Sequence, residues 1–149
     1  MKHFVIETIV NAPMEKVWQN FDIHLFHALQ PAFPKTEILQ FDGSEPGNEV
    51  KIILHILGLK QRFFARIVDR KESAAENYFI DEGTETPFFI KTWRHKHIVS
   101  RLDENSSVIK DNITFSSPNK IMEAFFYPVL YAQMYFRKAV YRKYFSQKI

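Results

Sequence analysis

The pattern of apolar residues changes once along this chain, near residue 119, and that change limits the folds open to it. Before it, short apolar stretches follow one another with turn residues between them; after it, apolar residues recur at helical spacing to about residue 145. Alternation with a period of two is typical of strands, and a spacing of three to four is typical of helices. The sequence therefore predicts a run of strands followed by one long helix.

The strands are predicted from β-branched and aromatic residues and from the turns that separate them. A first strand is expected over residues 3–10, and further strands over residues 36–41, 49–57, 61–70, 76–81, 88–102 and 107–115. Tight turns, such as Gly58-Leu59, join consecutive segments, which favours an antiparallel meander. We therefore expect a curved, seven-stranded antiparallel sheet.

Two short helices are predicted between the first two strands. Asn11 is expected to cap the first helix, Pro13 suits its first turn, and Pro31 ends the second. In the terminal helix, Asn119 is the predicted cap, and Pro128 is expected to kink the helix or to split it in two. The residues predicted to form its apolar stripe are Ile121, Phe125, Val129, Phe136, Val140 and Tyr144.

These elements define an α+β fold of one domain over residues 1–149, since no linker rich in Gly, Ser or Pro interrupts the chain. The sheet needs cover for its apolar face, and the terminal helix is the only predicted element long enough to supply it. A curved sheet is wider than one helix. We therefore expect space between the two.

Composition narrows the class of protein. The 15 Phe among 149 residues fit either a Phe-rich core or an apolar pocket. The chain has no Cys, which excludes disulfides, thiolate nucleophiles and Cys-ligated metals. An early charge argues against a signal peptide, and no apolar run is long enough to span a bilayer. These features predict a cytoplasmic protein without integral membrane contact.

The basic residues gather toward the end of the chain. From Lys120 onward, six Lys or Arg stand against a single acid, Glu123. A solvated outer helix face explains this charge, and no recognition motif accompanies it, so no nucleic-acid partner is predicted. The chain has only four Gly and no Gly-rich phosphate loop, and no cofactor is expected.

Particular motifs resemble the START/SRPBCC superfamily, whose members have the helix-grip fold of the birch-pollen-allergen type. Ala12-Pro13 followed by Val17-Trp18 is similar to the usual start of its first helix. Residues in the second half of the chain resemble a bacterial subgroup of this superfamily. They are Pro87-Phe88, Trp93-Arg94-His95-Lys96-His97, Asp111, Phe115 and Pro118. The resemblance implies an apolar cavity under the terminal helix. It does not fix the function, because the superfamily includes lipid and hormone binders, polyketide cyclases, ring-hydroxylase subunits and chaperone co-activators.

The segment 88–102 carries the candidate site. The residues that share one face by period two, and that we assign to the cavity, include Phe89, Trp93, His95 and His97. On the next strand, Asp111 lies between two Ile residues on the inward face. A buried carboxylate needs a partner, and His95 or His97 is the natural one.

Three interpretations of His95, His97 and Asp111 stay open. They form a structural hydrogen-bonded cluster, they anchor the polar group of a ligand, or they act in acid–base catalysis or metal binding. A metal would need a third protein ligand, which the spacing does not supply, and His55 is the one further strand histidine considered. No metal site is predicted.

The function expected first is non-enzymatic binding of a small hydrophobic molecule. The predicted ligand contacts are Trp93, His95, His97, Asp111, Phe89, Phe125, Phe126 and Val129. One alternative is an enzyme of the cyclase, dehydratase or isomerase kind, acting on a polyketide-like or aromatic substrate with His95, His97 and Asp111 as acid–base groups. Another is a protein-interaction module, which would need an exposed apolar patch. The sequence leaves the ligand and the oligomeric state open.

Overall fold

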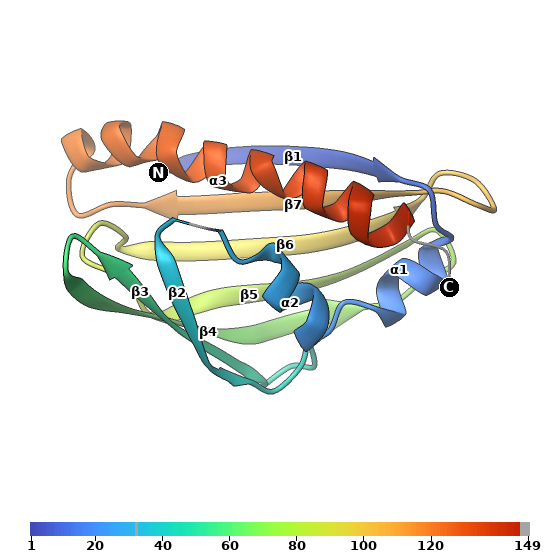
Figure 1. The fold of residues 1–149 in the computed structure, drawn as a ribbon, viewed down its shortest axis with the longest axis horizontal. Helices are drawn as coiled ribbons and strands as arrows, with labels where there is room; N and C mark the ends of the chain where they lie inside the picture. The colour runs from blue at the N-terminus through green and yellow to red at the C-terminus, as the bar shows by residue number, and fades with distance from the viewer. Residues whose placement is uncertain (32, 147–149) are drawn as a thin grey trace.

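A computed structural model describes residues 1–31 and 33–146 of the chain (Figure 1). The elements follow in the order β1 (Lys2–Val10), α1 (Met14–Gln19), α2 (Ile23–Leu29), β2 (Lys35–Phe41), β3 (Glu49–Ile56), β4 (Leu59–Lys71), β5 (Glu76–Glu85), β6 (Thr92–Arg101), β7 (Ser107–Ser116) and α3 (Lys120–Ser146). This is the order that the alternating and helical patterns predict.

The seven strands form one antiparallel sheet in the order β1-β7-β6-β5-β4-β3-β2. Consecutive strands from β2 to β7 are neighbours, and β1 closes the far edge against β7, with Ile6 opposite Asp111. Helix α3 runs along β1 and contacts α2, so the helices cover one face of the curved sheet (Figure 1). The predicted α+β helix-grip architecture is confirmed.

The prediction of a long strand over residues 88–102 is partly wrong, because β6 begins only at Thr92. Pro87 starts a turn in which its carbonyl accepts a hydrogen bond from the Ile90 N–H at 3.0 Å. The preceding strand continues instead, and β5 runs through Gly83, where a break was expected.

The predicted helix caps have different outcomes. Asn119 caps α3 as expected, because its Oδ1 accepts the backbone N–H of Met122 at 2.8 Å. Asn11 does not cap α1, whose N-cap residue is Pro13 and whose first turn receives no side-chain hydrogen bond. Helix α3 is continuous through Pro128, so of the two alternatives, a kink or a division into two helices, the division does not occur.

The predicted apolar stripe of α3 is wrong over the first part of the helix, whereas Val140 and Tyr144 near its end are partly buried and pack against the core. Ile121 is 84% exposed, Phe125 67% and Phe136 71%, while the buried face is formed by Glu123, Leu130, Met134, Tyr141 and Phe145. The predicted residues were grouped mostly by a spacing of four, and residues four apart are turned by about 40° around the helix axis. Such a row drifts around the helix, whereas the buried residues follow steps of seven and four that keep one face.

Buried side chains form two apolar clusters on the concave face. The first includes Phe79, Val99, Ile109 and Tyr141 and extends to α1 and α2. The second includes Trp93, Ile113, Phe115, Leu130 and Met134 and extends to the start of α3. The apolar core is therefore divided along β6 and β7, and the residues at the division are polar.

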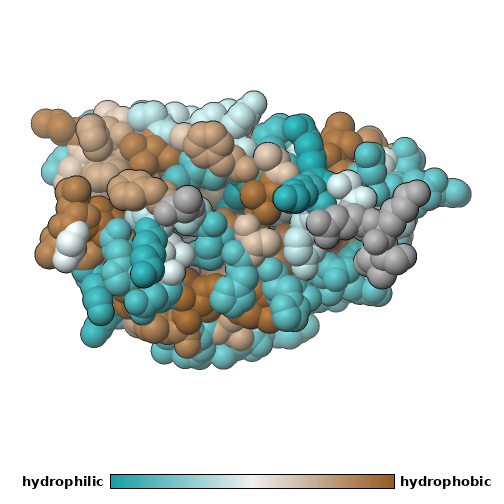
Figure 2. All heavy atoms as spheres, in the orientation of Figure 1, coloured by the Kyte–Doolittle hydropathy of each residue, from teal (hydrophilic) through white to brown (hydrophobic). Residues whose placement is uncertain are grey.

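Other apolar side chains are exposed. In Figure 2, apolar residues gather at the end of the molecule where α3 begins. No helix in the described part of the chain is long and apolar enough to cross a membrane.

Candidate functional site

Two histidines and two aspartates meet on the concave face of the sheet, between the two apolar clusters. Alternation along β6 turns Trp93, His95 and His97 inward, and alternation along β7 turns Asp111 inward. On β5 the same alternation places Asp81 on this face, two residues after Phe79. The four titratable residues come from three neighbouring strands, so the sheet itself fixes their relative positions.

Each histidine contacts one carboxylate. The Nε2 atom of His95 lies 2.9 Å from Oδ1 of Asp111, and Nε2 of His97 lies 2.6 Å from Oδ2 of Asp81. The indole N–H of Trp93 donates to Oδ1 of Asp81 at 3.1 Å. With both carboxylates ionised, each imidazole donates its Nε2–H and leaves Nδ1 free for another partner.

The pairing is diagonal across the sheet. The residue directly opposite Asp111 is His97, and the residue directly opposite Asp81 is His95, yet each carboxylate bonds the other histidine. Diagonal neighbours lie within reach of long side chains on a twisted sheet. The crossed arrangement also brings the two imidazole rings together, with ring centroids 3.6 Å apart and 27° between the planes.

Aromatic rings hold the histidines in place. Phe79 stacks on His97 with a centroid separation of 4.3 Å, and Trp93 meets the edge of His95 at 6.0 Å. These contacts restrict the ring orientations, so the free nitrogen atoms have defined directions.

Helix α3 closes the cluster from above with two polar side chains. The Nη1 atom of Arg137 lies 3.9 Å from Oδ1 of Asp111, and the Tyr141 hydroxyl donates to the same oxygen over 3.5 Å. The other oxygen of Asp111, Oδ2, is buried and has no hydrogen-bond partner among the described residues. The carboxylate is therefore only partly satisfied by the protein.

The environment shifts the protonation equilibria of the cluster. Burial, reinforced by the electrostatic interaction with His95, lowers the pKa of His97 to about 4, and the bond to Asp81 only partly opposes this shift. Burial alone would raise the pKa of Asp81 and of Asp111. The hydrogen bonds from His97 and His95, together with the electrostatic attraction of the histidines and, for Asp111, of Arg137, outweigh burial, so both pKa values lie below their usual range. At neutral pH the site holds a neutral His97 between ionised carboxylates.

Water reaches part of this cluster. The side chains of Asp81 and His97 keep 13% and 14% of their surface exposed, whereas that of Asp111 keeps 1%. The side of the cluster nearest β5 is therefore partly exposed, and the side nearest β7 is closed.

The structure brings most of the predicted site residues together. Trp93, His95, His97 and Asp111 lie in the cluster, and Phe89, although it precedes β6, is buried and stacks on Phe126 at 4.2 Å. Phe125 and Val129 are 67% and 42% exposed. Of the three predicted contacts on α3, Phe126 is therefore the one that packs against the core.

Three residues of the cluster were missed from the sequence, and one considered residue lies elsewhere. Asp81 shares a period-two face with Phe79, which was a usable signal, but the register that sets it beside His95 is not visible in a sequence. Arg137 and Tyr141 were missed because the helix face was assigned wrongly. His55 lies on the opposite face of the sheet, where its Nε2 is 3.1 Å from Oε1 of Glu37.

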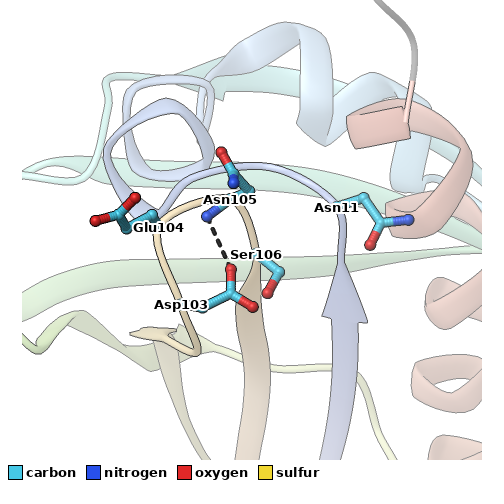
Figure 3. A pocket seen from close by; sticks show the side chains of 5 residues that line it. All are labelled: Asn11, Asp103, Glu104, Asn105 and Ser106. Atoms are coloured by element: carbon cyan, nitrogen blue, oxygen red, sulfur yellow. Dashed lines mark hydrogen bonds between the residues drawn. The ribbon is translucent and has the colours of Figure 1, made fainter.

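Two surface hollows lie away from this cluster. One is lined by Asn11 and by the turn between β6 and β7, where the Asn105 N–H donates to Asp103 at 2.8 Å (Figure 3). The other lies between the end of β1 and the last turns of α3. Neither is lined by a predicted ligand-binding residue, so the apolar cavity stays a prediction.

Comparison with known proteins reveals similarity in fold. No family model matches the chain, and no curated protein matches it by sequence. Norcoclaurine synthase from Thalictrum flavum, solved with dopamine and hydroxybenzaldehyde, is similar with a TM-score of 0.67 and 17% identity, over 99% of this chain and 88% of that one.

Two bacterial structures show the same likeness. Zhui aromatase/cyclase from a Streptomyces species has a TM-score of 0.65 and 15% identity, over 93% of this chain and 90% of that one. A protein from Thermobifida fusca has a TM-score of 0.62 and 20% identity, over 89% and 85% of the two chains. At 20% identity or less, these three structures show that the chain shares their fold.

Proposed function

On the basis of this shared fold, we propose that the protein binds a small molecule with an apolar body and one polar group, and that the polar group lies against the cluster on β5 and β6. The observation that carries the proposal is a buried, hydrogen-bonded group of two histidines and two aspartates set into an otherwise apolar wall. Ligand pockets typically combine apolar walls with a few such polar groups.

Apolar side chains flank the cluster on both sides. Phe79 stacks on His97 from one side, and Trp93 lies beside His95 on the other, where Phe63 packs edge-on against its ring at 5.1 Å. A ligand in this place would contact the aromatic rings with its apolar body. Its polar group would meet the exposed parts of Asp81 and His97, which can accept and donate hydrogen bonds.

The solved neighbours support an aromatic ligand. The norcoclaurine synthase structure holds dopamine and hydroxybenzaldehyde, two small aromatic molecules with polar substituents. Trp93, Phe89 and Phe126 are aromatic side chains of the second apolar cluster, and they would pack against the ring of such a molecule. We propose these three residues, with His97 and Asp81, as the ligand contacts in this chain.

Native mass spectrometry of freshly purified protein tests the proposal. We expect an added mass that disappears on denaturation and that solvent extraction recovers as a small organic molecule. A matched pair of variants locates it: His97→Leu should lose the added mass, and His55→Leu, on the other face of the sheet, should keep it. Loss in both variants, or retention in both, would refute this site.

A second candidate function is acid–base catalysis on an aromatic substrate, and the contact between His97 and Asp81 favours it. A neutral imidazole that is hydrogen-bonded to a carboxylate is a usual general base. Conversion of the recovered molecule during incubation, abolished in His97→Gln, would support catalysis. Recovery of an unchanged molecule would support binding alone. A module that docks proteins through the exposed residues of α3 would instead purify without any small molecule.

A further inference from the structure

Three side chains of the cluster could place metal-binding atoms around one point. Asp81, His95 and His97 each offer one ligand atom, and these atoms lie within 4.8 Å of one another. In a tetrahedral zinc site with bonds of about 2.0–2.1 Å, ligand atoms lie roughly 3.3 Å apart. The present separations bracket that value, since Nε2 of His97 is 2.6 Å from Oδ2 of Asp81 and Nδ1 of His95 is 4.0 Å from it. Small side-chain movements would therefore complete the site.

His95 has the orientation of a metal ligand. Its Nε2–H donates to Asp111, and its Nδ1 consequently faces Asp81 with its lone pair available. Histidines that bind metals almost always donate their other N–H to a carboxylate or a carbonyl group, which fixes the tautomer and the ring plane. Asp111 holds His95 in this way, and Arg137 and Tyr141 from α3 in turn contact Asp111.

The carboxylates of the cluster would balance the positive charge of a bound cation. Asp81 is mostly buried, and its hydrogen bonds come from the N–H groups of Trp93 and His97. The buried Oδ2 of Asp111 has no hydrogen-bond partner within residues 1–31 and 33–146. Metal binding at Nε2 of His97 would require the ring to carry its proton on Nδ1 instead, because the ligand nitrogen needs its lone pair.

We propose that Asp81, His95 and His97 form a binding site for one divalent transition-metal ion, with Asp111 as the residue that positions His95. Two imidazoles and one carboxylate are a ligand set for zinc and for related first-row metals. Three protein ligands leave one coordination position open. The side chains of Asp81 and His97 keep 13% and 14% of their surface exposed, so an ion would reach the site from their side.

This inference does not depend on the proposed organic ligand. The metal would bind to the protein alone, so metal binding can succeed where ligand binding fails, and the reverse. The two proposals are distinguished because the test uses inorganic ions only.

Titration calorimetry of chelator-treated protein with Zn²⁺ tests the site. We expect one ion per chain, and Co²⁺ in its place should give the visible absorption bands of a site with nitrogen and oxygen ligands. Asp81→Asn and His97→Gln should each weaken Zn²⁺ binding by more than about tenfold, and Asp111→Asn by about 10–100-fold. The matched control is His55→Gln, which removes a strand histidine that also contacts a carboxylate, and it should leave the affinity unchanged.

Circular dichroism of each variant separates loss of the site from loss of the fold. A variant that keeps the spectrum and thermal transition of the parent protein but loses Zn²⁺ supports the proposal. Absence of stoichiometric Zn²⁺ binding in the parent protein would overturn it. So would binding that survives in both Asp81→Asn and His97→Gln, because the ion would then lie at another site.

Discussion

Nε2 of His95 lies 2.9 Å from Oδ1 of Asp111, and both side chains are almost completely buried. A second His–acid pair, His55 with Glu37, has a similar separation of 3.1 Å but lies on the solvent-facing side of the sheet. The two pairs have the same chemistry in opposite environments, so they separate the effect of burial from the effect of the contact itself.

The first prediction concerns this difference in environment. Asp111→Ala leaves His95 buried without its carboxylate, and breaking a buried pair typically costs about 3–5 kcal/mol. Glu37→Ala breaks an exposed pair, which contributes at most about 1 kcal/mol. Urea unfolding of both variants measures the two losses. Equal losses would show that the buried pair has no special role in stability.

The second prediction concerns the loss of folding stability at acidic pH. The pKa of His97 is lowered to about 4 from an ordinary value of 6.5, so between these values the unfolded chain binds a proton that the folded chain does not. Stability therefore rises with pH across this window and falls on acidification. The lowered pKa values of Asp81 and Asp111 act in the same direction, because the stability that they contribute is lost as pH falls through the folded values.

Urea unfolding of the chelator-treated protein at several pH values between about 7 and 4 measures this slope. The groups that face His97 are Asp81 on β5, His95 on its own strand and Asp111 on β7, with Arg137 beyond Asp111 on α3. His97→Phe should flatten the slope, and His55→Phe should not. An unchanged slope in His97→Phe would assign the acid sensitivity to other residues.

The third prediction tests which face of α3 is buried. Phe145 is 5% exposed and Phe136 is 71% exposed, although both are phenylalanines on the same helix. Phe145→Ala should lower the free energy of unfolding by about 3–5 kcal/mol, and Phe136→Ala should change it by no more than about 0.5 kcal/mol. A larger loss of stability in Phe136→Ala than in Phe145→Ala would show that the buried face is the one predicted from the spacing of four.

The fourth prediction concerns Pro128, which cannot donate the backbone hydrogen bond that its position in α3 calls for. We predict that hydrogen exchange of the amides on either side of Pro128 is faster than in the last turns of the helix. Bound ligand should slow that exchange, because the helix covers the concave face. Equal protection along the whole helix, with and without ligand, would show that Pro128 does not cause local opening of the helix.

Sequence patterns were sufficient for the strands and their order. Alternation and turn residues predict all seven strands because these signals are local, and a meander leaves few choices of topology. The same local signals failed at residues 88–91, where Pro87 and Ile90 make a turn although the residues alternate like a strand.

Features that depend on contacts between elements were harder to predict. Helix α3 carries aromatic residues on every side, with Phe125, Phe126 and Tyr127 in succession, so its composition does not mark a buried face. Asp81 was missed as a partner of His97 because the register between β5 and β6 is set by packing of the whole sheet. Asp111 was found because it interrupts the apolar face of its strand, and that signal is local.

We expect a small molecule to bind against the cluster on the concave face. The indole N–H groups of the two tryptophans provide two reporters, since Trp93 donates to Asp81 within the cluster and Trp18 donates to Glu72 outside it. Nitrogen-15 NMR resolves the two signals, and the variant Trp18→Phe assigns them. On titration with anilinonaphthalene sulfonate, an apolar probe with one charged group, we expect a saturable shift of the Trp93 signal and an unchanged Trp18 signal. Saturable binding that leaves the Trp93 signal unmoved would refute binding against the cluster.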